Sequence, residues 1–171
     1  MKGSSQGQED ILPLIKGRRS IRCFKKDTVS QEIIDKIIEA ARWAPSGLNN
    51  QPWKFKVLRN KEKDSLSQYT KYEKIIKEAD CAICVFLDQK VSYNYEKDLL
   101  AVGAAIQNIL LYVHSIKLGA CWLGEILNQR QEINKRFNIP ETLQLEAVIA
   151  LGSPAQTTLA KKRKSIKEIK V

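Results

Sequence analysis

The residues DLLAVGAAIQNILLYVHSIKL (98–118) and the following GACWLG (119–124) decide how this chain folds. Residues 98–118 predict a helix, because apolar side chains recur at intervals of three and four and Gly119 follows the expected end. Its apolar positions are Leu99, Val102, Ala105, Ile106, Ile109, Leu110, Val113 and Ile116. So much of the circumference is apolar that we expect the helix to be buried on several sides. Residues 120–123 predict a short strand directly after it.

Three further strands are predicted around this helix. Residues 81–87 (CAICVFL) are apolar throughout and predict a central strand, and residues 145–151 predict a second buried one. Residues 53–57 alternate between apolar and lysine side chains, which is typical of a half-buried strand. Strands interleaved with helices predict a layered α/β or α+β domain. Helices are expected at 11–16, at 31–44 after an N-cap at Ser30, at 61–79 and at 128–137, with a long polar connection at 88–97.

The length and composition predict one globular domain. The chain has 171 residues, of which 43% are hydrophobic and 28% are charged. We expect a single domain over residues 1–171, with a flexible N-terminus at 1–10 and a C-terminal extension at 155–171. The longest apolar run, residues 99–106, is far shorter than the roughly 20 residues of a membrane helix, and no signal peptide is visible. Together with ordinary cysteine usage, this favours a cytoplasmic protein that does not bind a membrane.

The formal net charge of +10 is concentrated near the two ends of the chain. Residues 16–26 hold six basic residues and no acid, and residues 161–170 hold six basic residues and one acid. The rest of the chain is close to neutral. Such patches suit a compact anion such as a phosphate, or nucleic acid, and a basic stretch can also be merely solvated.

Several kinds of site find no support in the sequence. No GxGxxG follows the first expected strand and no Walker loop is present, so a Rossmann or nucleotide-triphosphate site lacks its phosphate-binding loop. The only histidine, His114, is interpreted as a packed or surface residue of the long helix. Cys81 and Cys84 look like a metal or redox pair, but their spacing within a strand places them on opposite faces of the sheet. We therefore predict no metal site.

Four segments in a fixed order carry a specific pattern. They are RRSIR (18–22) with APSGLNNQPW (44–53), Gln107-Asn108, LGACWLG (118–124) and KKR (161–163). Together they resemble the FMN-dependent nitroreductase family, from about residue 11 to the C-terminus. The resemblance implies an α+β fold: a three-layer sandwich with a central mixed sheet flanked by helices. It also implies a homodimer with FMN in two clefts at the subunit interface.

The resemblance assigns the basic clusters to the cofactor. FMN carries a phosphate, and arginine forks can hold it where no glycine-rich loop is available. The residues that the resemblance brings to the phosphate are Arg18, Arg19, Ser20, Lys161 and Arg163. Arg22 matches the family position that places a cation near the pyrimidine edge of the flavin, where it favours the anionic reduced ring.

Two other segments match the family's contacts with the flavin ring. Pro45, Ser46, Gly47, Asn49 and Gln51 lie in the loop that reaches the flavin from the partner subunit. The backbone of Gly124 and Glu125 matches the segment against the reactive N5 edge. Glu125 stands where the family usually has a small residue, and its carboxylate either disfavours acidic substrates or points away.

The resemblance implies a ping-pong reaction in which NADH or NADPH reduces FMN and a nitroaromatic, quinone or other small electrophile then takes the electrons. No catalytic side chain is predicted, because the flavin carries the chemistry. Within the same fold, reductive dehalogenation, enone or aldehyde reduction and oxygen-dependent chemistry remain open. Two other classes also remain: an FMN storage or carrier protein without turnover, and a basic nucleic-acid-binding module. We expect no nucleic-acid partner, since the basic segments contain only one aromatic residue, Phe24.

Overall fold

A computed structural model describes residues 10–171 and places a four-stranded sheet at the centre of the molecule. The strand order is β1-β2-β4-β3, and all three pairings are antiparallel. The mixed sheet that we predicted is therefore wrong for the four strands: the one parallel contact among the described residues is an isolated bridge between Ser20 and Ala120. The strands are β1 (Trp53–Arg59), β2 (Cys81–Asp88), β3 (Gly119–Leu123) and β4 (Leu143–Gly152).

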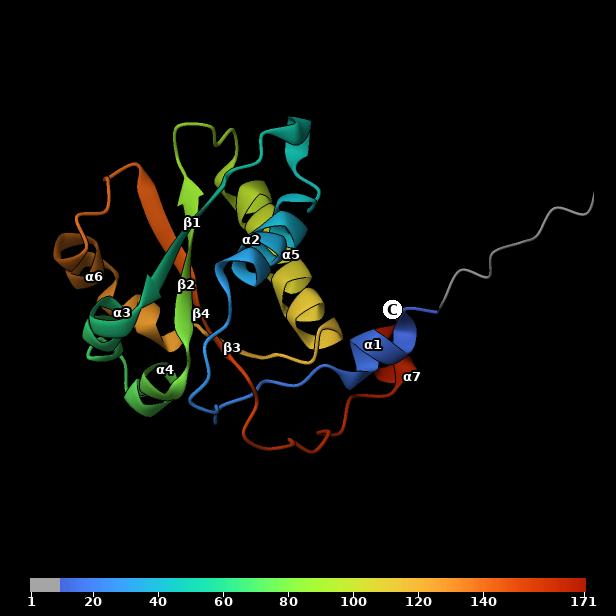
Figure 1. Ribbon diagram of the computed structural model, residues 1–171. Helices are drawn as coiled ribbons and strands as arrows, with labels where there is room; N and C mark the ends of the chain where they lie inside the picture. The colour runs from blue at the N-terminus through green and yellow to red at the C-terminus, as the bar shows by residue number, and fades with distance from the viewer. Residues whose placement is uncertain (1–9) are drawn as a thin grey trace, which may run out of the picture.

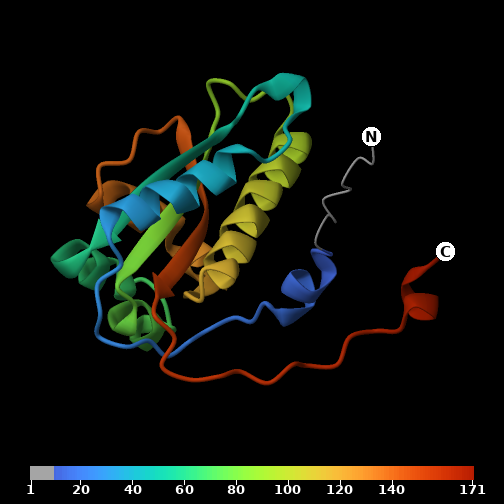
Figure 2. The ribbon, with the colours of Figure 1, turned by 45° about the vertical axis from the view of Figure 1, so that its right-hand side comes forward.

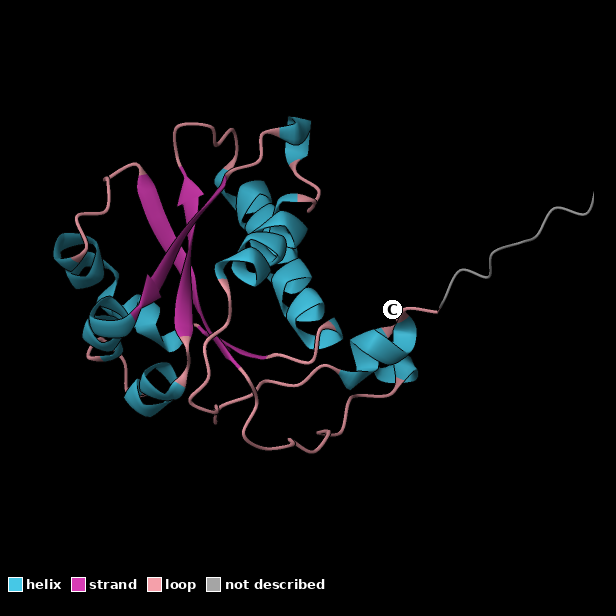
Figure 3. Cartoon of the chain, in the orientation of Figure 1, coloured by secondary structure: helices cyan, strands magenta, loops and turns pink. Residues whose placement is uncertain are grey.

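Helices cover both faces of the sheet, so the predicted three-layer α+β sandwich is confirmed (Figures 1 and 3). One face packs against α2 (Gln31–Arg42) and α5 (Tyr95–Ser115). The opposite face packs against α3 (Asn60–Ser67), α4 (Glu73–Glu78), the 3-10 turn η2 (Glu125–Gln129) and α6 (Arg130–Arg136). Two short helices, α1 (Leu12–Gly17) and α7 (Ile166–Ile169), lie near the two ends of the chain.

Strand β2 is buried along its whole length, as its apolar sequence predicts. Its side chains alternate between the two cores: Cys81 packs on the α2/α5 side and Cys84 on the α3/α4 side. The predicted divergence of these two thiols is thus confirmed. Burial raises the pKa of both Cys81 and Cys84 to about 12, so neither is a ready thiolate at neutral pH.

Helix α5 is the long helix of the sequence, shifted by three residues. It begins at Tyr95 because the Asn94 side chain accepts a hydrogen bond from the Lys97 N–H (3.1 Å), which caps the first turn ahead of the expected start at 98. By length and composition alone α5 could cross a membrane, but eight of its residues are buried within this domain. Its remaining face is open: Leu100 is 76% exposed. The expected burial on several sides is therefore incomplete within one chain.

Two other helix boundaries differ from the prediction. The expected helix at 61–79 is two helices, α3 and α4, and the break contains Thr70, whose hydroxyl accepts a hydrogen bond from the Tyr72 N–H (3.2 Å). The expected helix at 128–137 is the turn η2 followed by α6. The connection before α5 is also shorter than 88–97, because β2 extends to Asp88 and α5 starts at Tyr95. In each case local side-chain hydrogen bonding or tertiary packing outweighs the helical periodicity.

Residues 155–171 leave the layered body and lead away from it to α7 (Figure 2). Their large apolar side chains are exposed, including Leu159 at 90%, Ile166 at 66% and Ile169 at 65%. Of the N-terminus predicted to be flexible, residues 1–9 lie outside the described residues.

Candidate functional site

A cavity of about 510 Å³ lies between residues 15–22 and residues 158–163. All six residues that the sequence assigns to the phosphate and the adjacent cation position line it, and the lining contains no acid. These residues are Arg18, Arg19, Ser20, Arg22, Lys161 and Arg163. The structure therefore brings together two basic segments that are about 140 residues apart in the sequence. We call this space the basic cavity.

Backbone hydrogen bonds hold the two segments side by side. The Ile21 N–H donates to the Ala120 carbonyl (2.9 Å), which fixes the residues after α1 along the outer edge of β3. The Lys25 N–H donates to the Ser153 carbonyl (2.9 Å), and the Ala155 N–H donates to the Cys23 carbonyl (3.0 Å). The chain leaving β4 is thus aligned with the chain leaving α1, and the cations on both face the same space.

The basic cavity is electropositive. Burial lowers the pKa of Arg18, and the nearby Arg163 and Arg19 lower it further, because each cation disfavours its neighbour. Arg19 is oriented by donating to the Lys16 carbonyl (2.6 Å) and the Arg18 carbonyl (2.8 Å) at the end of α1. Convergent guanidinium groups without an acidic partner are suited to bind an anion, phosphate above all.

The loop at residues 45–51 is strained. Leu48, Asn49 and Gln51 have positive φ angles of 53°, 54° and 47°, which cost of order 1–3 kcal/mol each in residues other than glycine. Leu48 is also 86% exposed. The Ser46 hydroxyl accepts a hydrogen bond from the Gln51 N–H (3.0 Å) and closes the loop. Strain of this kind is typical of functional segments held in place by their surroundings.

Asp98, near the start of α5, holds this loop in place through hydrogen bonds. The sequence analysis did not identify it. Its carboxylate accepts from the Asn50 side-chain amide (2.9 Å), the Ser92 hydroxyl (2.7 Å) and the Tyr93 N–H (3.0 Å). Its side chain is fully buried, and although burial alone would raise its pKa, these hydrogen bonds outweigh burial and lower the pKa of Asp98. An acid in an apolar helix was a usable signal, but its partner Asn50 is 48 residues away.

The same contacts explain Gly47. A Cβ at this position would lie 2.0 Å from the Tyr93 hydroxyl oxygen, so the segment before α5 packs directly on the loop. The loop, the residues before α5 and Asp98 form one unit.

Asp98→Asn is expected to destabilise the protein by about 1–3 kcal/mol at pH 7, because an amide cannot accept all of these hydrogen bonds. The folded-state pKa of Asp98 is below its unfolded value of about 3.9, so its stabilisation is present above that value and is lost as the pH falls through the folded pKa. Urea unfolding of both proteins should show a difference that shrinks below about pH 4. The control is Asp35→Asn at an exposed site on α2. A loss at pH 7 as small as that of the control would contradict this role.

The loop does not reach the basic cavity of its own chain. None of Pro45, Ser46, Gly47, Asn49 and Gln51 lines that cavity. The loop packs at the start of α5, near Asp98, whereas Gln107, nine residues further along α5, lines the cavity. Figure 1 shows the loop beside one end of α5 and α1, which leads into the basic segment, beside the other end.

Gly124 and Glu125 follow the end of β3. A Cβ at Gly124 would meet nothing within 4 Å, so the backbone there is open on one side. The Glu125 carboxylate accepts a hydrogen bond from the Thr70 hydroxyl (2.5 Å), and it is thus turned toward the α3–α4 connection. Trp122, on β3 just before them, is 46% exposed and was not predicted to be a site residue.

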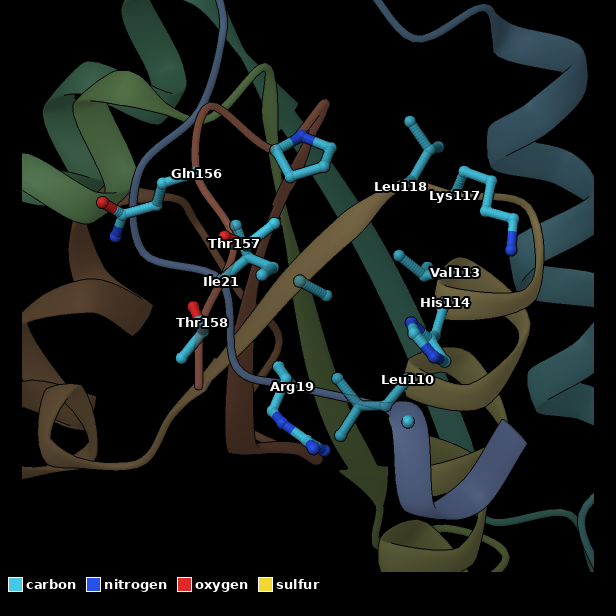
Figure 4. Close-up of a pocket in the computed structure, with 13 residues that line it drawn as sticks. Arg19, Ile21, Leu110, Val113, His114, Lys117, Leu118, Gln156, Thr157 and Thr158 are labelled. Carbon is cyan, nitrogen blue, oxygen red and sulfur yellow. The ribbon is translucent and has the colours of Figure 1, made fainter. Parts of the chain in front are cut away.

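A second cavity, of about 370 Å³, lies across the extended segment at residues 17–21 (Figure 4). Side chains of an extended segment alternate, so Ile21 faces this cavity while Ser20 faces the basic one. Its walls are mainly apolar, and Figure 4 shows Leu110 and His114 of α5 opposite Ile21 and Thr157. Burial, and then nearby cations, lower the pKa of His114, so its imidazole is neutral at pH 7. The predicted packed or surface histidine is thus partly buried at the wall of this cavity.

Comparison with known proteins assigns the chain to a family. A model of the nitroreductase family matches residues 15–79 and 64–153, and the chain belongs to that family. The relative from Methanothermobacter thermautotrophicus, provisionally named NADH dehydrogenase/NAD(P)H nitroreductase, is 40% identical over 86% of this chain and 78% of its own length. A protein with the same provisional name from Archaeoglobus fulgidus is 35% identical over 85% of this chain and 86% of its own.

A solved structure extends the comparison to the fold. The provisionally named nitroreductase from Desulfovibrio desulfuricans, crystallised in complex with FMN, is 42% identical with a TM-score of 0.91 over 96% of both chains. The chain is therefore an oxidoreductase of a flavin-dependent NAD(P)H family, as its motifs indicated.

Proposed function

We propose that this protein is an FMN-dependent NAD(P)H oxidoreductase that passes a hydride through FMN to a small electrophilic acceptor, a nitroaromatic or a quinone. The observation that carries the proposal is the basic cavity, built from both ends of the chain without an acid. The similar protein of known structure was crystallised with FMN, which supports the same cofactor here.

The residues around the cavity fit the phosphate of FMN. Arg163 is close enough to Arg18 to lower the pKa of Arg18, and an anion between the two guanidinium groups would relieve that repulsion. Ser20 adds a hydroxyl donor, and Lys161 a further charge. The phosphate is the part of FMN that carries negative charge, so we place it among Arg18, Arg163, Ser20 and Lys161.

The protein's part in the reaction is to bind and orient the cofactor. When bound, FMN accepts a hydride from the nicotinamide and gives two electrons to the acceptor. Arg22 supplies a cation on the same side of the extended segment as Arg18 and Ser20. The open backbone at Gly124 allows close approach to a planar ring. No side-chain acid or base is assigned.

We further propose that the working unit is a homodimer. The face of α5 that carries Leu100 lacks a cover within the described chain. The loop at 45–51 is strained and exposed, yet it stands away from the cavity of its own chain. Both features are accounted for if two copies pack along α5 and each loop, with Asn49 and Gln51, completes the flavin site of the other.

Purified protein loaded with FMN should be yellow, and anaerobic NADH or NADPH should bleach its flavin absorption. The measurement is a visible spectrum before and after the nicotinamide is added, followed by re-oxidation with a quinone or a nitroaromatic. A protein that takes up no FMN would refute the proposal. A protein that binds FMN but is never reduced by either nicotinamide would instead be a storage or carrier protein.

A further inference from the structure

We propose that Glu125 is a positioning residue of the flavin site. Its hydrogen bond with Thr70 holds the backbone at 124–126 in place and keeps its charge away from the acceptor. Acceptors that bear a carboxylate are therefore used as readily as neutral ones. This inference rests on the proposed function. Glu125 is the only acid among the predicted flavin-binding residues, so the direction of its side chain decides whether the site repels anions.

The hydrogen bond is short and mostly buried. The Thr70 hydroxyl donates to Glu125 Oε2 over 2.5 Å, and Thr70 is only 8% exposed. The same hydroxyl oxygen accepts from the Tyr72 N–H (3.2 Å), which directs its single proton toward Glu125. A hydrogen bond to a carboxylate in such a place is stronger than one between neutral groups.

This bond and one buried side chain fix the segment from one side. Ile126 is fully buried against the α3/α4 face of the sheet, and the Leu127 N–H donates to the Gly124 carbonyl (3.1 Å). On the other side the backbone at Gly124 is open. Glu125 and Thr70 therefore hold the backbone at 124–126 from the side of the α3–α4 connection, and the opposite side of this backbone is free to lie against the flavin.

The direction of the Glu125 side chain also determines which charges face the flavin site. The basic cavity has no acid in its lining, and Glu125 is not among its lining residues. With the carboxylate bound to Thr70, the charged side chains on the cavity side of the site are cationic. Because the Glu125 carboxylate is bound by Thr70, an acceptor with a carboxylate at the flavin ring meets no repulsion from this side chain.

The first test is a double-mutant cycle on the FMN-free protein, with Thr70→Val, Glu125→Gln and both together in urea unfolding. The pair should be coupled, with about a tenfold effect on the unfolding equilibrium constant. Thr70→Ser keeps the hydroxyl and should retain the coupling with Glu125 that Thr70→Val loses. Additive single effects would overturn the proposal, whether or not the protein turns over.

The second test uses the FMN-loaded protein and two acceptors of the same shape, 4-nitrobenzoate and 4-nitrobenzamide. Thr70→Val should slow reduction of the bound flavin by NADH about tenfold at unchanged FMN affinity, and Thr70→Ser should not. The kcat/KM values for the two acceptors should be similar in the wild type, and their ratio should be the same in Glu125→Gln. A shift of about tenfold toward the anion in Glu125→Gln alone would show that the carboxylate faces the acceptor. Failure of the wild type to reduce any acceptor would count against the proposed function, and the unfolding cycle would still decide the contact.

Discussion

Arg18→Ala is expected to weaken FMN binding by about 10- to 150-fold and to leave riboflavin binding almost unchanged. A hydrogen bond to a charged group contributes about 1.5–3 kcal/mol, and riboflavin has the same ring without the phosphate. Arg163→Ala should behave in the same way, because the structure places both residues at the basic cavity. Titration of the two ligands by flavin fluorescence measures each affinity.

The matched control is Arg136→Ala on α6, an arginine whose side chain bonds the Ser65 hydroxyl oxygen (3.1 Å) away from the cavity. It should change neither affinity.

Asn49→Ala should weaken the binding of both ligands similarly, because its expected contact is with the flavin ring. Equal losses for FMN and riboflavin in Arg18→Ala would mean that the phosphate has been placed wrongly. Unchanged FMN affinity with loss of duplex binding would favour the nucleic-acid alternative.

Salt gives a further comparison within the same experiment. Raising the ionic strength should weaken FMN binding more than riboflavin binding, since only FMN carries the phosphate charge. The effect should be smaller than for a fully exposed patch, because Arg18 is partly buried.

Leu100→Glu is expected to convert a dimer into a 19.5 kDa monomer and to lose most of the bound FMN. Leu100 is 76% exposed in one chain, so the substitution costs little within the subunit. In a dimer packed along α5 it would bury an unpaired carboxylate, at a cost of about 3–5 kcal/mol, which is enough to break the interface. Light scattering and the flavin absorption of the same sample report mass and cofactor together.

Gln131→Glu on α6 adds the same charge at an exposed position of the opposite layer and should leave both mass and FMN content unchanged. Dilution of the wild type should lower its stability and FMN content in parallel, as expected where folding and assembly are linked. A wild-type monomer that binds FMN tightly, or a Leu100→Glu dimer with full cofactor, would contradict the dimer proposal.

Much of the fold follows from local patterns. Ser30 caps α2 as expected, accepting from the Ile33 N–H (3.3 Å), and the unbroken apolar run at 81–87 is a central strand. The charge distribution located the two basic segments, and the resemblance to the nitroreductase family then grouped Arg18 with Arg163. The cap and the strand depend only on neighbouring residues, which is why the sequence alone predicts them.

Other features depend on contacts between distant residues and could not be derived from the pattern. Asp98 pairs with Asn50 across 48 residues, and the direction of Glu125 is set by Thr70, 55 residues away. The break between α3 and α4 involves the same threonine. Strand direction was also wrong, because parallel and antiparallel partners of a buried strand share one composition.

The separation of Cys81 and Cys84 by the sheet has a consequence for how electrons leave this protein. Enzymes that pass electrons from a flavin to a disulfide need two thiols that can meet, one of them readily ionised. Here Cys81 and Cys84 point into different cores, and burial also raises the pKa of Cys121. Cys23 is partly exposed and forms no disulfide. The four thiols of the chain therefore offer no sulfur relay, and under the proposed function the acceptor has to reach the flavin ring itself.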